Sequence, residues 1–297
     1  MLTLRAPAKL NLVLEVLGKR ADGYHEIRSI VQTVDFCDNL ELEPAGSFSF
    51  DCSVEALRGP ENLVVRAARM LAETAGIKPG VRITLRKRIP QGIGLGGGSS
   101  DAAACLLGLN HLWGLGMPID QLGTIGARLG SDVPFFLYGG TCLVEGRGER
   151  VIPMPDPSLQ WMVLLFPSIR GMPEKTRRMY QALTRADFSD GSKTETVRRH
   201  IADGKPISAD VLFNAFERAA RLEFPGLSDV WRQFETITGE GVHLCGSGPA
   251  LFSLYLTKAV AEVVVGRLRG QDIEAYAVRW LSRTVNVLYA GAGGGLL

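Results

Sequence analysis

The chain has 297 residues, which is enough for two domains of ordinary size, because a single hydrophobic core rarely grows beyond about 250–300 residues. Hydrophobic residues make up 46% of the sequence and charged residues 22%, a mixture that excludes a largely disordered protein. The 33 Lys and Arg residues nearly balance the 31 Asp and Glu residues, which argues against nucleic acid as a partner bound through bulk positive charge.

The first half of the chain predicts strands followed by helices. Apolar runs, alternating or continuous, predict strands at residues 10–17, 27–36, 47–54 and 81–85. Asn62 is a potential N-cap for a helix that repeats small and apolar residues every fourth position. Two further helices are expected, at residues 102–112 after a glycine-rich loop and from Pro118 to about Gly130.

The second half predicts a separate α+β unit. Prolines at positions 153, 155 and 157 place a boundary near residue 155, which divides a domain at 1–155 from one at 156–297. Beyond it we expect strands at 161–166, 242–244 and 251–256, helices between 173 and 238 and at 260–269, and closing strands through Leu288. The predicted fold class is therefore α+β with two domains.

Cysteine usage and hydropathy bear on the location of the chain. Five scattered cysteines, none at a C-x-x-C spacing, favour neither a disulfide framework nor a zinc site. Lys9 and Asn11 interrupt the apolar N-terminal run, unlike a secretory signal, and no apolar stretch approaches the ~20 residues of a membrane helix. We expect a cytoplasmic protein with no membrane partner.

The stretch P-Q-G-I-G-L-G-G-G-S-S-D-A-A-A, residues 90–104, joins a predicted strand to a predicted helix. Consecutive glycines let backbone N–H groups approach an anion, and a helix N-terminus adds unpaired donors. A flexible linker is one interpretation, and a dinucleotide fingerprint is another, because the glycines fit G-x-G-x-x-G with Asp120 some twenty residues later. Asp120 follows Pro118 in a second helical segment, which instead favours a nucleotide phosphate loop without the Walker lysine.

This loop resembles the ATP-binding motif P-x-x-x-G-L-G-x-S-S-A of the GHMP kinase superfamily, with an extra glycine and with Asp101 in place of alanine. Two more stretches resemble family motifs: G-S-D-V-P-F-F at 130–136 and C-G-S-G-P-A-L-F at 245–252, where Cys245 replaces the usual Ser or Thr. The opening A-P-A-K-L-N-L and the stretch R-A-D-G-Y-H-E are similar to one branch of the superfamily, which phosphorylates a cytidyl diphosphate-linked methylerythritol.

The resemblance implies an S5-like N-terminal domain and a ferredoxin-like C-terminal domain with the active site between them. It implies transfer of the ATP γ-phosphate to the 2-hydroxyl of 4-diphosphocytidyl-2-C-methyl-D-erythritol, in the non-mevalonate route to isoprenoid precursors. Mg²⁺ is expected because it neutralises the triphosphate, although no metal ligand can be named. The alternatives are another GHMP kinase acting on a small alcohol or sugar, as homoserine and mevalonate kinases do, a nicotinamide dehydrogenase, and a non-catalytic RNA- or nucleotide-binding module.

The resemblance also implies roles for individual residues. Asp132 would accept the proton of the attacking hydroxyl and Lys9 would neutralise charge, whereas without the resemblance they read as an N-cap and a surface lysine. The implied nucleotide-binding residues are Asn62, Pro90, Gly92, Gly94, Leu95, Gly96, Gly97, Gly98, Ser99 and Ser100. The implied substrate-binding residues are Asn11, Tyr24, His25, Asp132 and Tyr180.

Four interpretations of these positions stay open on sequence alone. Tyr24 and His25 also read as part of a hairpin loop, and Tyr180 as an ordinary helix-face tyrosine. Asn62 contacts adenine or is simply an N-cap. The basic residues 86–88 are expected to form a solvated surface that could also attract ATP.

Overall fold

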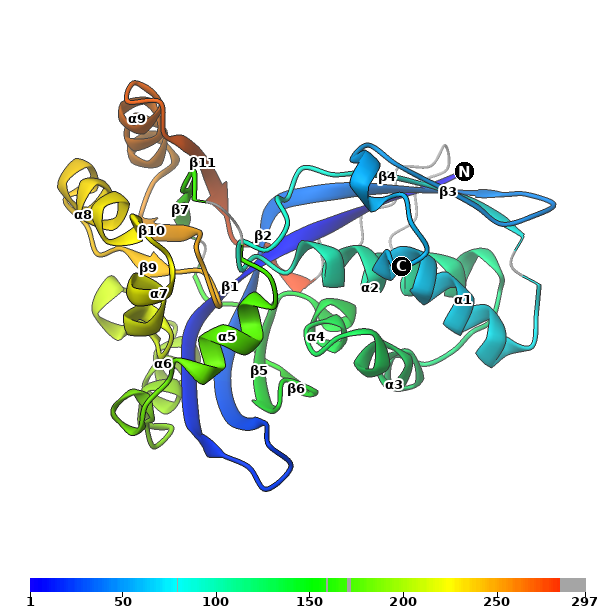
Figure 1. The fold of residues 1–297 in the computed structure, drawn as a ribbon, viewed down its shortest axis with the longest axis horizontal. Helices are drawn as coiled ribbons and strands as arrows, with labels where there is room; N and C mark the ends of the chain where they lie inside the picture. Colours follow the sequence, from blue (N-terminus) through cyan, green and yellow to red (C-terminus); the bar gives the residue numbers. More distant parts are fainter. Residues whose placement is uncertain (79, 159, 170–171, 284–297) are drawn as a thin grey trace.

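The computed structural model describes residues 1–78, 80–158, 160–169 and 172–283. Within these ranges the chain forms two β-sheets, each with its own helices, so the predicted α+β class is confirmed. Helices α1 to α4 lie to one side of the molecule and α6 to α9 to the other, with the long strands β1 and β2 running between them (Figure 1).

The first sheet contains seven strands in the described part of the chain, in the order β3-β4-β2-β1-β8, with β5 paired to β2 and β6 to β5. Their bounds are β1 (Leu2–Lys19), β2 (His25–Pro44), β3 (Ser49–Cys52), β4 (Val81–Arg86), β5 (Thr141–Gly146), β6 (Arg150–Pro153) and β8 (Phe213–Asn214). Four helices pack against this sheet through a shared apolar core: α1 (Leu63–Ala75), α2 (Gly97–Leu112), α3 (Ile119–Leu129) and α4 (Val133–Tyr138).

Strand β1 is much longer than the predicted 10–17. Lys9, Asn11 and Glu15 break the apolar pattern that marks a strand in the sequence, yet all three side chains are buried in the structure. Each has a polar partner; the Glu15 carboxylate, for example, accepts hydrogen bonds from the Thr194 backbone N–H (2.7 Å) and hydroxyl (2.6 Å). The polar residues therefore mark buried polar contacts within one strand, and not the end of a strand.

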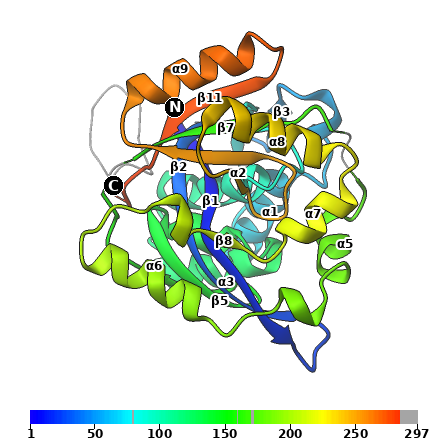
Figure 2. The same ribbon diagram turned by 90° about the vertical axis from the view of Figure 1, so that its left-hand side faces the viewer.

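The second sheet is antiparallel, in the order β11-β7-β10-β9. Its strands are β7 (Trp161–Phe166), β9 (His243–Leu244), β10 (Leu251–Tyr255) and β11 (Glu274–Arg279). The remaining helices are α5 (Lys175–Gln181), α6 (Ser192–Ala202), α7 (Glu217–Glu223), α8 (Leu227–Thr238) and α9 (Lys258–Arg269), with short 3₁₀ turns at Glu55–Leu57, Arg185–Asp187 and Ala209–Val211. Figure 2 shows α8 and α9 over this sheet and α6 beside β1.

Segments after residue 156 also join the first sheet. Strand β8 runs parallel to β1, and Trp280 forms a bridge with Val34 on β2. The boundary near residue 155 stays a prediction. Residues 284–297, including the predicted end of the closing strands at Leu288, lie outside the described residues.

The five cysteines are free and buried. Burial raises the pKa of the Cys37 thiol to about 11 and that of Cys142 to about 12. In the described ranges, no helix combines the length and the apolar character needed to cross a membrane.

Candidate active site

A cleft of about 1640 Å³ lies between the two sides of the molecule. It is lined by β1, the β1–β2 turn, the glycine loop, the turn before α4, α5 and a second glycine turn at residues 246–248. Every residue predicted to belong to the site, except Ser100, contributes to the lining.

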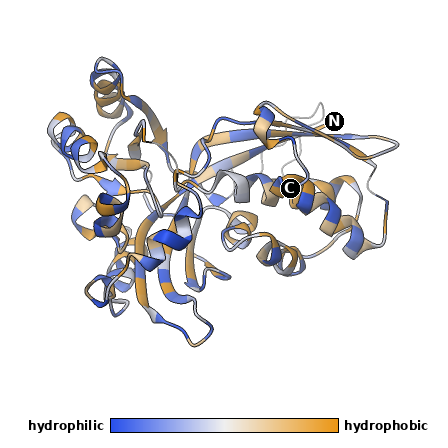
Figure 3. Ribbon diagram, viewed as in Figure 1, coloured by the Kyte–Doolittle hydropathy of each residue, from blue (hydrophilic) through white to orange (hydrophobic). Residues whose placement is uncertain are grey.

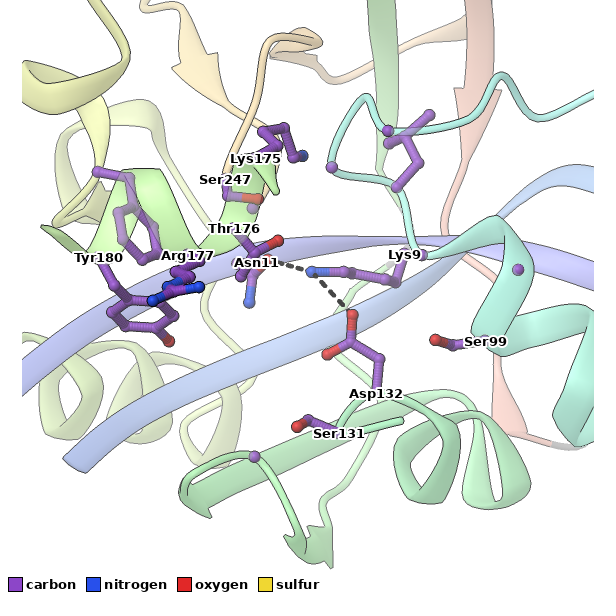
Figure 4. A pocket seen from close by; sticks show the side chains of 18 of the residues that line it. Lys9, Asn11, Ser99, Ser131, Asp132, Lys175, Thr176, Arg177, Tyr180 and Ser247 are labelled. Atoms are coloured by element: carbon purple, nitrogen blue, oxygen red, sulfur yellow. Dashed lines mark hydrogen bonds and ion pairs between the residues drawn. The ribbon is translucent and has the colours of Figure 1, made fainter. Parts of the chain in front are cut away.

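At the centre of the cleft, Lys9 faces Asp132 (Figure 4). The Lys9 Nζ donates a hydrogen bond to Asn11 Oδ1 (2.8 Å) and lies 3.9 Å from Asp132 Oδ2. Asn11 Nδ2 donates in turn to Ser29 Oγ (2.9 Å), and the Ser29 hydroxyl donates to the carbonyl of Val13 (2.6 Å). This chain of hydrogen bonds holds the lysine in one position, so the interpretation of Lys9 as a surface lysine is wrong.

Asp132 occupies the N-cap position of α4, but its side chain makes no capping hydrogen bond. The side chain is 49% exposed and points toward Lys9 (Figure 4). The carboxylate is therefore open to a molecule in the cleft and is oriented by the ammonium group.

The glycine loop reaches the same centre from the other side. The backbone N–H of Lys9 donates to the carbonyl of Leu95 (3.0 Å), which ties the loop to β1. Gly96 is the N-cap of α2 with a φ of 73°, and a Cβ there would lie 2.8 Å from the Phe136 ring. The first turn of α2 contains no acidic residue and its residues 97–99 line the cleft, so the positive end of the helix dipole lies at the cleft.

Gly97 behaves differently from its neighbours. A Cβ on Gly97 would meet Ile89 Cγ2 at 2.9 Å and Lys87 Nζ at 3.2 Å, so this glycine is required for packing beneath the loop. A Cβ added to Gly98 would lie 3.7 Å from the nearest atom, Leu63 Cδ1, which is an ordinary van der Waals contact.

Two residues predicted to bind the nucleotide, Ser100 and Asn62, have other surroundings in the structure. Ser100 is buried on the far side of α2, beside Leu4 and Pro7, and its backbone N–H donates to the Gly96 carbonyl within the helix. Neither polar group of Ser100 points into the cleft, so we remove it from the candidate site. Asn62 is an N-cap, because its Oδ1 accepts from the Val64 N–H (2.9 Å), and its contact with adenine stays a prediction.

A buried charge cluster underlies the loop. The Lys87 ammonium bonds Asp101 Oδ2 (2.7 Å) and Asp38, so the expectation that this basic run is a solvated surface is wrong for Lys87. Burial, aided by the charge of Asp38 and opposed by Lys87, raises the pKa of Asp101 to about 8. The cluster joins the end of β4 to the first turns of α2 and so fixes the position of the loop.

The dinucleotide interpretation is wrong. Helix α2 is followed by α3 and α4, where a dinucleotide-binding unit requires a parallel strand. Asp120 lies on α3, and its Oδ1 accepts a hydrogen bond from the Tyr138 hydroxyl (2.8 Å).

At the other end of the cleft, aromatic side chains gather around His25. The His25 and Tyr180 rings stack at 4.9 Å with an interplanar angle of 18°, and Phe188 meets His25 edge-on at 6.0 Å. Tyr24 is 57% exposed and has the Arg147 guanidinium 4.8 Å above its ring. Burial, and then the charge of Lys19, lowers the pKa of His25, which keeps the imidazole neutral and able both to donate and to accept.

The second glycine turn closes over the lysine. A Cβ on Gly246 would lie 2.8 Å from the Gly94 carbonyl oxygen and 3.0 Å from Lys9 Nζ, and a Cβ on Gly94 would lie 1.9 Å from the Cys245 carbonyl oxygen. The Cys245 N–H donates to the Ala250 carbonyl and the Gly248 N–H donates to the Cys245 carbonyl (both 2.8 Å), so the turn forms these backbone hydrogen bonds with a cysteine at this position.

The sequence interpretation missed several residues that line the cleft, among them Ser131, Lys175, Thr176 and Ser247 (Figure 4). The Lys175 Nζ donates to the Gly248 carbonyl (2.6 Å), and burial, followed by the charge of Lys9, lowers its pKa to about 8. Its only sequence signal is a Lys-Thr pair five and four residues before Tyr180, in a segment that departs from the family pattern.

The chain matches known proteins over nearly its whole length. The family of GHMP kinases N terminal domains matches residues 62–140. A 4-diphosphocytidyl-2-C-methyl-D-erythritol kinase of Dehalococcoides mccartyi is 44% identical over 281 residues, which cover 95% of this chain and 99% of the relative. The chain belongs to the 4-diphosphocytidyl-2-C-methyl-D-erythritol kinase family of GHMP kinases. A Geobacillus member of this family is 36% identical over 283 residues, covering 94% of this chain and 97% of the relative.

Solved structures agree with this family and its fold. A crystal structure of a 4-(cytidine 5'-diphospho)-2C-methyl-D-erythritol kinase superposes with a TM-score of 0.80 at 36% identity, covering 94% of this chain and 98% of that one. A homoserine kinase from Cytophaga hutchinsonii has a TM-score of 0.72 at 19% identity, covering 97% of this chain and 96% of that one, and shows likeness of fold alone. The predicted GHMP kinase fold is confirmed.

Proposed function

We propose that this chain transfers the γ-phosphate of ATP to the 2-hydroxyl of 4-diphosphocytidyl-2-C-methyl-D-erythritol, in the non-mevalonate route to isoprenoid precursors. The observation that carries the proposal is the position of the Lys9–Asp132 pair, 3.9 Å apart, where the glycine loop and the aromatic end of the cleft meet. A phosphate donor on the loop and a cytidine at the aromatic end would both reach this pair.

In the proposed reaction the 2-hydroxyl lies against Asp132. Its oxygen forms a bond to the γ-phosphorus, the bond from that phosphorus to the β,γ-bridging oxygen breaks, and ADP leaves with the bond's electron pair. The Asp132 carboxylate takes the hydroxyl proton. Lys9, held by Asn11 at 2.8 Å, offsets negative charge that develops between the two reactants.

The nucleotide phosphates would lie along the glycine loop and the first turn of α2. Backbone N–H groups at Gly97 and Gly98 and the Ser99 hydroxyl would contact the phosphate oxygens. Mg²⁺ binds largely through the phosphates of its nucleotide, and a hydroxyl at the phosphate loop fits such a site. Ser99 is the side chain that would hold the ion, which would supply neutralisation of the triphosphate.

The cytosine ring would be bound at the aromatic end. Tyr24 and Tyr180 offer stacking surfaces, and the neutral His25 can pair with the base edge. This cluster is the reason to favour a cytidyl substrate over the small alcohols and sugars phosphorylated by other GHMP kinases. The buried free thiols fit a reducing compartment, and we propose a cytoplasmic location on that ground.

The test is ADP release from MgATP over a panel of acceptors that contains the cytidyl substrate, mevalonate and homoserine. We expect turnover with the cytidyl substrate alone, and its loss when EDTA removes Mg²⁺. Turnover with mevalonate or homoserine and none with the cytidyl substrate would contradict the proposal.

A further inference from the structure

Lys175 is a half-buried cation in the cleft, and within the part of the chain that the structure describes it has no carboxylate partner. Its one hydrogen bond among the described residues goes to the neutral carbonyl of Gly248, at 2.6 Å. The other shielded lysines of the cleft differ: Lys9 pairs with Asp132, and Lys87 pairs with two carboxylates. Because a shielded ammonium without a counter-ion is unfavourable, this position indicates that an anion completes the site.

The helix that carries Lys175 also carries Tyr180, which stacks on His25. Five residues of helix span about 7.5 Å, so α5 reaches from the aromatic cluster toward the catalytic pair. Figure 3 shows most of α5 as hydrophilic, although the helix lies across the middle of the molecule. At the Lys175 end, the charged groups that act on its ammonium are Lys9 from β1 and Asp132 from the turn before α4, together with the Cys245 thiol.

We propose that Lys175 binds the diphosphate of the cytidyl substrate, an inference that rests on the proposed function. A cytidine diphosphate whose base lies against Tyr180 would extend its phosphates along α5, toward the end where Lys175 lies. The ATP phosphates, in contrast, lie on the loop before α2, which is a different element. Lys175 is thus a specificity residue for the acceptor, and it selects an acceptor that carries a diphosphate between its base and its alcohol.

The experiment compares equilibrium binding of cytidine 5'-diphosphate and cytidine by calorimetry. The wild type should bind the diphosphate at least tenfold more tightly, the order expected for one charge-assisted hydrogen bond. Lys175→Met should remove most of this preference, and Lys175→Arg should keep much of it. Arg178→Met is the matched control, because Arg178 lies on the same helix but pairs with Glu223 at 3.1 Å outside the cleft lining.

Two outcomes would overturn the assignment. One is a Lys175→Met variant that retains the wild-type melting temperature and the full preference for the diphosphate. The other is a loss of ADP affinity in that variant with the preference unchanged, which would place the ammonium on the nucleotide. Wild-type turnover of the cytidyl substrate is measured in parallel, and its absence would contradict the proposed function and leave the binding result to stand by itself.

Discussion

The substitution Asp132→Asn tests the centre of the proposed mechanism, because it retains the shape of the side chain and removes its charge and basicity. General-base assistance contributes about 10²–10⁴-fold, so kcat should fall by that factor, which corresponds to about 2.7–5.5 kcal/mol of transition-state stabilisation. The KM for ATP should change little, since the proposed phosphate contacts come from the glycine loop.

The structure predicts that this variant folds. The Asp132 side chain is 49% exposed, its distance to Lys9 is a long 3.9 Å, and it makes no capping bond to α4. A pair of this kind contributes about 0–1 kcal/mol to stability, and Lys9 keeps its hydrogen bond to Asn11. The melting temperature should therefore fall by no more than a few degrees.

The assay is steady-state ADP release with the cytidyl substrate, next to thermal unfolding of the same preparations. Asp229→Asn is the control, because Asp229 is exposed on α8 and pairs with Arg232 far from the cleft lining. Lys9→Met should also lower kcat, and the double variant with Asp132→Asn should lose less than the product of the two effects. A folded Asp132→Asn enzyme with more than a tenth of the wild-type kcat would refute the role of Asp132 as base.

Three further predictions concern the two ends of the cleft and the support beneath the loop. Tyr24→Ala should raise KM for the cytidyl substrate about tenfold or more and leave KM for ATP within about twofold, because base–aromatic stacking is worth about 1–3 kcal/mol; equal effects on both would refute a stacking role. Gly94→Ala should lower the free energy of unfolding by about 2–4 kcal/mol, since its φ is 95° and the new Cβ would lie 1.9 Å from a carbonyl oxygen. Gly116 also has a positive φ, but a Cβ added there would have no atom within 4 Å, so Gly116→Ala should lower the free energy of unfolding clearly less. Equal losses of unfolding free energy in urea would contradict the packing argument. The pKa of Asp101 is raised, so its protonated form favours the folded state, and the free energy of unfolding should fall as the pH rises from about 4 through about 8. Asp101→Asn should flatten this pH dependence, measured by urea unfolding. An unchanged pH dependence in the variant would contradict the role of Asp101.

The sequence predicted most elements of the second sheet and helices α1 to α3, because these segments carry apolar runs or apolar periodicity bounded by glycine or proline. Strand β1 was predicted too short, since Lys9 stands just before the predicted start at residue 10, and its buried polar partner, Asn11, is evident only in the structure. Strands β5 and β6 were not predicted at all, although the burial of Thr141–Gly146 is nearly continuous in the structure. The sequence of this strand, T-C-L-V-E-G, holds only three apolar residues in a row, which is too short a run to predict a strand.

For the site, motif resemblance indicated residues that lie in short local motifs, such as the glycine loop and the turn at Asp132, and the structure brings these residues into one cleft. It could not find Lys175, because the partner that reveals its burial is the Gly248 carbonyl, 73 residues away in sequence. It also assigned Ser100 to the nucleotide, because the motif gives two adjacent serines and only the helix phase decides which one faces the cleft. Lys87 was misjudged for a similar reason, since Asp38 and Asp101 come from distant segments.

The five buried thiols have a practical consequence for work with this protein. Alkylating reagents attack the thiolate, and burial keeps both water and reagent away from every one of these sulfur atoms. Labelling in native buffer therefore reports on transient opening of the chain, and the position of each labelled cysteine tells which part has opened. Labelling of Cys245 would report on the second glycine turn beside Lys9, and labelling of Cys52 and Cys105 would report on the core of the first sheet. The protein thus carries its own set of probes for local unfolding, with no need for an introduced label.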